Sequence, residues 1–408
     1  MTKKSKFISV KSSGAEFEVA TVLRKFGKAY RRKYHPTPQQ AKVMGSLKAC
    51  RTAKLGGHLN KCDQCGAFEF EYHSCRDRHC PKCGKFKKAE WVHRQSAVLL
   101  PIRYFHIIFT TDHALNPLIE RNRRALYNLL FRAASETLKA FGRQYHGGEI
   151  GITAVLHTWG QQLQPHVHLH CIVTGGALDV KSKRWHSSKP KFFAPVVALS
   201  RAYRDRFIAG LEKLGCAGQL DIGGVDMATL LSELRGKDWT VFAKGFKKPQ
   251  VVYEYLSRYV HQVALSNRRI TGIDRHGVSL TYYDNKDLED GTDRGKEKVL
   301  RLSGAAFIRR FVWHILPAGF RRIRHYGLHH PAARGKLSLA RRALGLDPAV
   351  PEVKELSLWD WLVALFGEDE INRCPRCGAV HSMRRVRADF GAPTWVQRMA
   401  PGLLGAAG

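Results

Sequence analysis

The chain has 408 residues, which is long enough to bury a sizeable core in two or three domains. Its 68 Lys and Arg residues exceed its 34 Asp and Glu residues, so the formal net charge is +34 and nucleic acid is the expected partner. A transmembrane protein is disfavoured because no apolar run reaches a membrane-spanning length. A secreted protein is disfavoured because no apolar signal core follows Met1–Lys4. We therefore expect a cytoplasmic protein without a membrane partner.

Residues 1–57 are predicted to form a basic helical arm. Helices are expected over 16–32 and 39–54, with Pro36 and Pro38 between them. The run 24–34 mixes cations with aromatic residues. That mixture is typical of nucleic-acid-binding arms, and equally of a solvated basic helix face.

Residues 58–98 are predicted to form a zinc-ribbon domain that binds DNA. Two Cys-x-x-Cys pairs flank a short alternating strand over 68–72, and pairs of this kind are typical of zinc rather than of disulfides. We expect one tetrahedral zinc site made of four cysteines: Cys62, Cys65, Cys80 and Cys83. Three cations interleaved with these ligands are expected to face DNA phosphates: Arg76, Arg78 and Lys82.

A third Cys-x-x-Cys pair, Cys374 and Cys377, lies near the C-terminus with His381 close by. By itself this pair supplies two or three ligands, so a second zinc site there is an open alternative. Cys75 and His79 are further candidate ligands for a second zinc, and the alternative for both is a structural duty or none.

Residues 99–275 are predicted to hold the catalytic domain, together with the helix that follows its sheet. Strands are expected over 104–111 and 152–157, and a helix over 116–142. A turn at 159–160 joins the second of these strands to a histidine-rich strand beginning at 164. Two strands joined by a short loop indicate an antiparallel hairpin at the centre of a sheet.

The histidine-rich strand carries His166, His168 and His170 in alternation with apolar residues. Because successive strand side chains point to opposite faces, the three imidazoles would share one face. Imidazole nitrogen binds divalent metals readily, so this face is a candidate metal site. The alternative is a strand whose histidines face solvent.

Further along the chain, helices are expected around 199–214 and 227–234 and a strand over 239–244. An amphipathic helix is then predicted over 249–267. Tyr255 and Tyr259 lie one turn apart on its same side, with Gln262 nearby. The alternative for the tyrosine pair is packing at the rim of a core helix.

Residues 276–408 are predicted to form a basic C-terminal region. It begins with a hairpin over 278–303, whose acidic tip is expected to be a solvated loop. A basic, aromatic stretch follows at 320–327 and contains Arg322 and Arg324. The third Cys-x-x-Cys pair closes the region.

The residues together predict a phosphoryl-transfer chemistry. A metal held by His168 and His170 in a very basic protein would polarise a phosphate oxygen of bound nucleic acid. A nearby tyrosine could then attack the phosphorus and form a covalent phosphotyrosine, which conserves the energy of the phosphodiester bond. Tyr255 and Tyr259 could perform two successive transfers.

Several motifs along most of the chain resemble the rolling-circle insertion-sequence transposases of the HUH (His-hydrophobic-His) endonuclease superfamily. The closest branch has two tyrosines and an N-terminal zinc-binding domain, and it is related to the common-region elements that move resistance genes. The shared motifs are the cysteine-rich ribbon at 55–83, the segments 100–106 and 154–161, the histidine strand, the tyrosine helix at 255–259, and 307–311, 322–327 and the final cysteine pair.

The resemblance implies an α+β fold, with a central antiparallel sheet of the HUH type, flanking helices, an N-terminal zinc ribbon and basic helical arms. It makes His168 and His170 the ligands of a catalytic Mg²⁺ or Mn²⁺. His166 is then an outer histidine that is able to compete with them as a metal ligand. Candidates for a third ligand are Gln161 and Gln262.

The implied activity is nicking and rejoining of single-stranded DNA through a 5′-phosphotyrosine on Tyr255 or Tyr259. The expected partners are single-stranded or hairpin DNA at the element ends and target DNA, contacted by the ribbon cations and by Arg258, Arg322 and Arg324. A plasmid replication initiator or relaxase with the same chemistry is one alternative. A zinc-dependent DNA-binding regulator without catalysis is the other.

Overall fold

The computed structural model of the protein describes residues 17–83, 90–95, 98–246, 264–289, 295–353 and 355–390. The chain divides into two compact units. The terminal unit is drawn from residues 1–89, 265–312 and 354–408, and the sheet unit from 90–264 and 313–353. Each unit therefore combines segments far apart in sequence, and their limits do not coincide with the consecutive segments 1–57, 58–98, 99–275 and 276–408 expected above.

The sheet unit is organised around a five-stranded antiparallel sheet with the order β12-β4-β5-β3-β8. Its strands are β3 (Tyr104–Thr110), β4 (Gly151–Trp159), β5 (Pro165–Thr174), β8 (Val241–Phe246) and β12 (Ile323–Gly327). The expected α+β class with a central antiparallel sheet is confirmed. The hairpin expected at 159–160 is also present, because β4 pairs with β5 from Ile152↔Val173 to Trp159↔Pro165.

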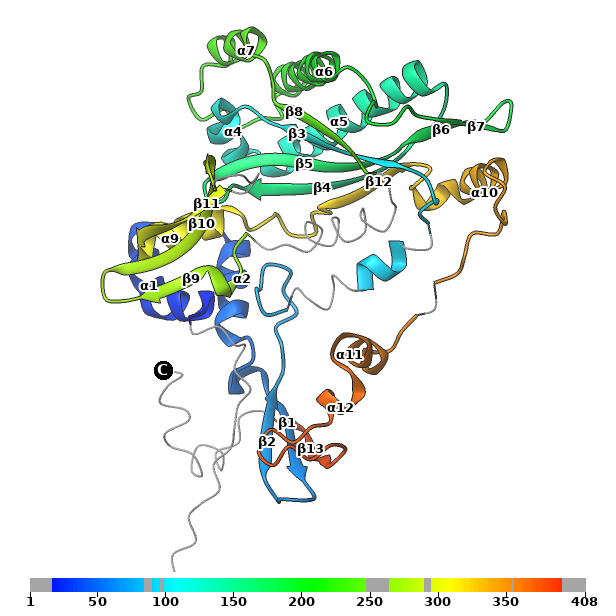
Figure 1. Ribbon diagram of the computed structural model, residues 1–408. Coiled ribbons are helices and arrows are strands. Elements are labelled where there is room, and N and C mark those ends of the chain that lie inside the picture. The colour runs from blue at the N-terminus through cyan, green and yellow to red at the C-terminus, as the bar shows by residue number, and fades with distance from the viewer. Residues whose placement is uncertain are drawn as a thin grey trace, which may run out of the picture. The chain divides into compact units, whose positions relative to one another are not determined.

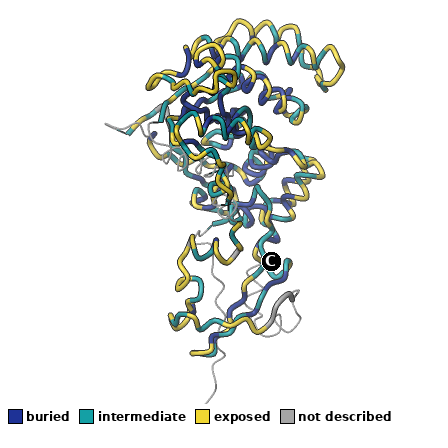
Figure 2. The backbone as a smooth tube through the Cα atoms, turned by 90° about the vertical axis from the view of Figure 1, so that its right-hand side faces the viewer, coloured by how far each residue is buried: buried dark blue, intermediate teal, exposed yellow. Residues whose placement is uncertain are grey.

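Alternation along these strands separates an apolar face from a polar one. Ile152, Leu156 and Leu169 belong to a buried cluster that also includes residues of the long helices α5 (Arg123–His146) and α6 (Val196–Cys216). Figure 1 shows both helices on one side of the sheet. The intervening residues, including the histidines of β5, must project from the opposite face. Nearly every residue of β4 and most residues of β5 are buried. Figure 2 shows long buried stretches of the chain in dark blue.

The remaining elements of the sheet unit surround this core. The helix expected over 116–142 is divided, because the chain departs from helical geometry at Asn122 between α4 and α5. The other elements are η2 (His113–Leu115), α4 (Asn116–Arg121), β6 (Gly176–Asp179), β7 (Arg184–Ser187), α7 (Met227–Gly236), η4 (Pro331–Ala333) and α10 (Arg334–Ala343).

The terminal unit contains two small antiparallel sheets and a set of helices. One sheet has the order β11-β10-β9 and contains the hairpin that was expected over 278–303. The elements outside the second sheet are α1 (Val19–Lys33), α2 (Pro38–Ala49), η1 (Ala53–Leu55), η3 (Asn267–Arg269), β9 (Ile270–Ile273), β10 (Gly277–Leu288), β11 (Gly295–Ser303), α9 (Gly304–Trp313), α11 (Leu358–Phe366) and α12 (Glu368–Ile371).

The second sheet joins the two ends of the described chain. Its order is β13-β1-β2, from β1 (Gly57–Cys62), β2 (Phe68–Tyr72) and β13 (Met383–Phe390). We call this sheet the ribbon. Figure 1 shows the N-terminal strands beside the C-terminal strand, and Cys62 is paired with Met383. This sheet contains the strand expected over 68–72, but its third strand comes from more than 300 residues further along the chain.

Two other expectations concern helices. The tyrosine helix predicted over 249–267 lies almost entirely outside the described residues, which resume at Ala264. Within the residues that the structure describes, no helix is long and apolar enough to cross a bilayer.

The packing of the sheet unit predicts a large cost for truncating a core residue of β5. Leu169 is fully buried, so Leu169→Ala should lower the free energy of unfolding of this unit by about 2–5 kcal/mol through lost apolar contact and a residual cavity. Urea unfolding followed by fluorescence measures the change. Val197→Ala, on the exposed side of α6, is the matched control and should stay within about 0.5 kcal/mol. Equal effects of the two substitutions would contradict the assignment of the core.

Candidate metal centres

Three histidines converge on the polar face of the central sheet. His168 and His170 come from β5, and His157 comes from β4, where the strand register places it directly opposite His168. The ligand nitrogens of the three side chains all lie within 4.8 Å of one another. We call this group the histidine centre. All three side chains are buried, so the group is held by the sheet rather than by mobile surface side chains.

The hydrogen bonds of the histidine centre are compatible with metal binding through the Nε2 atoms of His168 and His170. Nδ1 of His168 lies 2.9 Å from the carbonyl oxygen of His166, so this nitrogen must donate and Nε2 carries a lone pair. Nδ1 of His170 lies 2.9 Å from Nε2 of the buried His106 on β3. If His170 donates there, its Nε2 also carries a lone pair, directed toward His168.

The electrostatic environment keeps these imidazoles neutral. Burial, and secondarily the nearby His166, lower the pKa of His168 to about 3. Burial also holds the pKa of His170 well below its usual value. The pKa of His106 falls to about 4, through burial and then through the charge of Lys244. Neutral imidazole is the form that ligates a metal, and a neutral His106 is able to accept a hydrogen bond.

The spacing of the ligand nitrogens fits a metal ion. Nε2 of His168 and Nε2 of His170 are 3.0 Å apart. Adjacent ligands of an octahedral ion lie about 3.0 Å apart when each metal–nitrogen distance is about 2.1 Å. The donors, their protonation and their spacing therefore suit a divalent ion at the histidine centre.

Of the ligands expected from the sequence, only His168 and His170 belong to this centre among the described residues. His166 points to a different partner, because its Nδ1 lies 3.0 Å from Nε2 of His113. Gln161 is exposed on the turn between β4 and β5. Gln262, Tyr255 and Tyr259 lie outside the described residues.

His157 is the residue that the sequence reasoning missed as a ligand. A signal was available, because counting back along the predicted hairpin from the turn at 159–160 sets a histidine of the first strand opposite the histidine pair of the second. The register is irregular between His157 and Trp159, so a count that assumes regular pairing through the turn would not have found it reliably.

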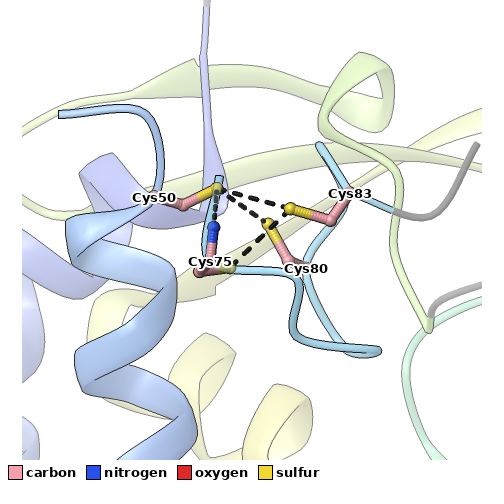
Figure 3. A group of neighbouring side chains, drawn as sticks. All are labelled: Cys50, Cys75, Cys80 and Cys83. Atoms are coloured by element: carbon pink, nitrogen blue, oxygen red, sulfur yellow. Dashed lines mark hydrogen bonds between the residues drawn. The ribbon is translucent and has the colours of Figure 1, made fainter. Parts of the chain in front are cut away.

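A second potential centre is formed by four cysteines of the terminal unit. Cys50 follows the end of α2, and the loop after β2 contributes the other three: Cys75, Cys80 and Cys83. Figure 3 shows their side chains turned toward one another. The Sγ atom of Cys50 lies 3.5 Å from that of Cys83 and 3.6 Å from that of Cys80. Hydrogen bonds from the Cys75 and Cys80 side chains lower the pKa of Cys50 to about 7, which favours the thiolate that binds metal.

A third potential centre combines Cys62 and Cys65 with Cys374 and Cys377. The single site expected from Cys62, Cys65, Cys80 and Cys83 is thus replaced by two sites. The physical reason is strand pairing, because β13 lies against β1 and carries the C-terminal cysteines to the end where Cys62 sits.

Two histidines proposed as zinc ligands have other partners. Nδ1 of His79 lies 2.9 Å from a carboxylate oxygen of Asp77. Nε2 of His381 lies 3.2 Å from a carboxylate oxygen of Asp369. Neither histidine belongs to the clusters of cysteine ligands among the described residues.

The cations expected to contact DNA differ in their surroundings. Arg76 is exposed and Arg78 is half-buried, whereas Lys82 makes a 2.8 Å ion pair with Glu18. Arg322 is buried, and the guanidinium of Arg324 lies 4.2 Å from the ring centre of Phe131. Arg258 lies outside the described residues. Among the described cations of this set, Arg76 is the one that is exposed.

Comparison with known families gives two matches. Residues 151–336 match a family described as "Putative transposase", and residues 22–111 match a family described as "Transposase zinc-binding domain". The first match contains the whole histidine centre, and the second contains Cys50, Cys75, Cys80 and Cys83.

Two curated relatives match over most of their length. The chain is 40% identical to "Putative transposase y4qJ" of Sinorhizobium fredii over 376 residues, which is 88% of this chain and 92% of the relative. It is 29% identical to "Transposase for insertion sequence element IS801" of Pseudomonas savastanoi pv. phaseolicola over 352 residues, covering 83% of this chain and 82% of that one. No solved structure matches the chain.

The geometry predicts that His157 contributes as much to metal binding as the β5 histidines do. His157→Ala and His168→Ala should each weaken Mn²⁺ binding by more than about 100-fold, because a lost ligand costs more than a lost supporting hydrogen bond. Mn²⁺ titration followed by electron paramagnetic resonance measures the affinity. His276→Ala, at an exposed turn of the terminal unit, is the control and should bind normally. Normal binding by His157→Ala together with lost binding by Gln161→Ala would instead identify Gln161 as the third ligand.

The 2.9 Å contact between His106 and His170 predicts a positioning role for His106. His106→Leu, which removes the acceptor, should weaken Mn²⁺ binding by about 10–100-fold. His106→Gln keeps an acceptor of similar reach and should recover most of the affinity. Equal affinities for the Leu and Gln variants would show that the side chain acts through packing alone.

Proposed function

Because the chain belongs to the transposase family whose members carry this zinc-binding domain, we propose that it nicks and rejoins single-stranded DNA at the ends of a mobile element through a covalent 5′-phosphotyrosine. The resemblance drawn from the sequence motifs is thereby confirmed at the level of the family. As a transposase, the protein acts on DNA at element ends and is a DNA-cleaving enzyme. The single-strand, rolling-circle form of the reaction is the proposal.

The histidine centre is the observation that carries this proposal. Two buried imidazoles, held neutral by burial, direct their Nε2 atoms toward one another, and a third histidine faces them from the paired strand. Without an ion, Nε2 of His170 can donate a hydrogen bond to Nε2 of His168 across this 3.0 Å contact. A metal ion bound by both nitrogens would take the place of that proton. In an enzyme that cleaves DNA, a metal ion at the histidine centre could activate a phosphate of the bound strand.

His157, His168 and His170 would hold the divalent ion. When bound, the ion would polarise a phosphate oxygen at the scissile position of the DNA. Of the two metals expected, Mn²⁺ suits nitrogen donors better than Mg²⁺, which prefers oxygen ligands. His106 and the carbonyl of His166 would fix the orientation of the two rings on β5.

The remaining chemistry is assigned to the tyrosines. The hydroxyl oxygen of Tyr255 or Tyr259 would attack the phosphorus and lose its proton, forming a tyrosine–phosphorus bond. The bond from phosphorus to the 3′ oxygen would break, and that oxygen would leave as a hydroxyl after taking up a proton. The role of these tyrosines rests on their sequence motif and on the family resemblance.

Rejoining would reverse these bond changes. A 3′-hydroxyl of another strand would attack the phosphotyrosine, restore a phosphodiester and release the tyrosine. No external energy source is needed, because the covalent intermediate keeps the energy of the original bond. Two tyrosines would allow one to nick the element end and the other to act in strand transfer.

The DNA would be bound mainly through its phosphates. The net charge of +34 supports an affinity that falls steeply as salt concentration rises. Arg76 is exposed, and it lies beside the cysteines of the zinc-binding domain. We propose it as a phosphate contact of that domain.

The proposal predicts a covalent protein–DNA adduct. The protein should be incubated with single-stranded element-end DNA and Mn²⁺ and then analysed by denaturing electrophoresis. The wild-type chain should form an adduct, and the double variant Tyr255→Phe/Tyr259→Phe should form none, because no phenolic oxygen remains at these positions to attack the phosphorus. Mn²⁺ should support the reaction at a lower concentration than Mg²⁺ does.

His168→Ala/His170→Ala distinguishes the roles of metal and nucleophile. This variant should bind the same DNA in a gel-shift assay but form no adduct. Adduct formation by the tyrosine double variant would disprove the nucleophile assignment. An intact DNA-binding activity without any adduct from the wild-type chain would favour the non-catalytic regulator.

A further inference from the structure

Two turns of the terminal unit, far apart along the chain, share one sequence pattern and one hydrogen-bonding pattern. The first is Cys62–Ala67 and the second is Cys374–Ala379, and both read Cys-x-x-Cys-Gly-Ala. In each turn the first cysteine donates its amide to the alanine carbonyl at 2.8 Å, and the glycine amide donates back to the carbonyl of that cysteine at 2.8 or 2.9 Å.

The glycines of these turns explain why the sequence is repeated. Gly66 has a φ of +64° and Gly378 has a φ of +75°, a left-handed conformation that a residue with a side chain adopts only at a cost. Such a turn points the two cysteine sulfurs of each pair to the same side. In the first turn the amide of Cys65 also donates to Sγ of Cys62 at 3.5 Å, a contact suited to a thiolate.

The two turns face each other at one end of the ribbon, where Cys62 pairs with Met383. Sγ of Cys62 lies 3.8 Å from Sγ of Cys377, and Sγ of Cys65 lies 3.8 Å from Sγ of Cys374. Sulfurs around a tetrahedral zinc lie about 3.8 Å apart when each zinc–sulfur distance is about 2.3 Å. A disulfide would require the sulfurs to be about 2.0 Å apart.

We propose that Cys62, Cys65, Cys374 and Cys377 bind a structural Zn²⁺ that fastens the C-terminal segment to the N-terminal hairpin. The family match described as a zinc-binding domain ends at residue 111, and the transposase match ends at residue 336, so neither includes Cys374 or Cys377. The site goes beyond the proposed reaction, because it involves neither the histidine centre nor the tyrosines.

The cysteine end of the ribbon has a very small apolar cluster. It contains Cys62, Ala67 and Cys374, with Cys65 and Met383 packed against it, whereas the larger buried side chains of β1 and β2, Leu59 and Phe70, lie further along the strands. A cluster of this size adds little free energy to offset the entropy of ordering the segment around residues 374–383. Zinc binding supplies folding free energy directly, as in other small metal-bound domains.

Direct contacts between the first turn and the residues that follow the second turn support the same arrangement. The amide of Asp63 donates to the carbonyl of Ser382 at 2.8 Å, and Sγ of Cys62 lies 3.2 Å from Oγ of Ser382. Nε of Arg384 is 3.3 Å from both carboxylate oxygens of Asp63. A chain that ends before residue 374 would lose half of the ligands and the whole of β13.

Zinc stoichiometry tests the proposal in the full chain. The background is His168→Ala/His170→Ala, so that the histidine centre binds no metal, and zinc is measured by mass spectrometry of the purified protein. We expect two zinc ions per chain, one of them at Cys50, Cys75, Cys80 and Cys83. Cys374→Ser/Cys377→Ser should retain one ion, and so should Cys62→Ser/Cys65→Ser. Replacing all four cysteines should also leave one.

A conservative substitution shows whether zinc is lost because a ligand is removed or because the variant misfolds. Cys377 is exposed, so Cys377→His can offer a nitrogen ligand at the same place and should retain two zinc ions. Cys216→Ser replaces an exposed cysteine outside both cysteine clusters and should also retain two. Two zinc ions in the Cys374→Ser/Cys377→Ser variant would overturn the proposal.

A second measurement tests the link between the two ends of the chain. Trypsin cleavage at the exposed Arg384 and Arg385 should become about tenfold faster or more in Cys62→Ser/Cys65→Ser, although the substitutions are more than 300 residues away in sequence. Cys80→Ser/Cys83→Ser, at the other cysteine cluster, is the matched control and should leave this rate within a factor of about two. Equal cleavage rates in the two variants would overturn the proposed fastening.

Discussion

The antiparallel pairing of β4 with β5 is the constraint on which the histidine centre depends. Pairing sets His157 opposite His168, and alternation along β5 sets His170 on the same face. A slip of one residue would turn the histidines toward the apolar cluster and would turn Val167 and Leu169 away from it. Packing of the opposite face against α5 and α6 prevents that slip, so the hydrophobic core fixes the geometry of the polar site.

Burial of the polar face then determines the chemistry that the histidines can perform. Exposed imidazoles are partly protonated near neutral pH, and neighbouring protonated rings repel one another. Here burial lowers the pKa of His168 and His106 to about 3 and 4, and the carbonyl of His166 orients one ring. The result is a set of nitrogen donors arranged before any ion binds, which reduces the cost of ordering them on binding.

The cysteine clusters are suited to stabilising the fold, whereas the histidine centre is suited to chemistry. The sheet unit is held by a large apolar core, whereas the cluster at the cysteine end of the ribbon contains only a few small side chains. Two four-cysteine clusters lie in the terminal unit, and one of them joins segments separated by most of the chain. Metal ligation suits this task because four short bonds can replace the area that a small sheet cannot bury.

Local patterns in the sequence determined most of the secondary structure, the basic character, the presence of zinc-type cysteine pairs and the shared face of His168 and His170. Those features depend on neighbours within a few residues, through alternation, turn chemistry and ligand spacing. Only the tertiary structure decided which pairs share a site. Cys62 and Cys65 join Cys374 and Cys377, while Cys80 and Cys83 join Cys50 and Cys75, because strand pairing between β1 and β13 links distant segments. The same reason applies to His106, whose contact with β5 arises from strand register across the sheet. For His157 the hairpin gave a signal, but the irregular register between His157 and Trp159 made it unreliable.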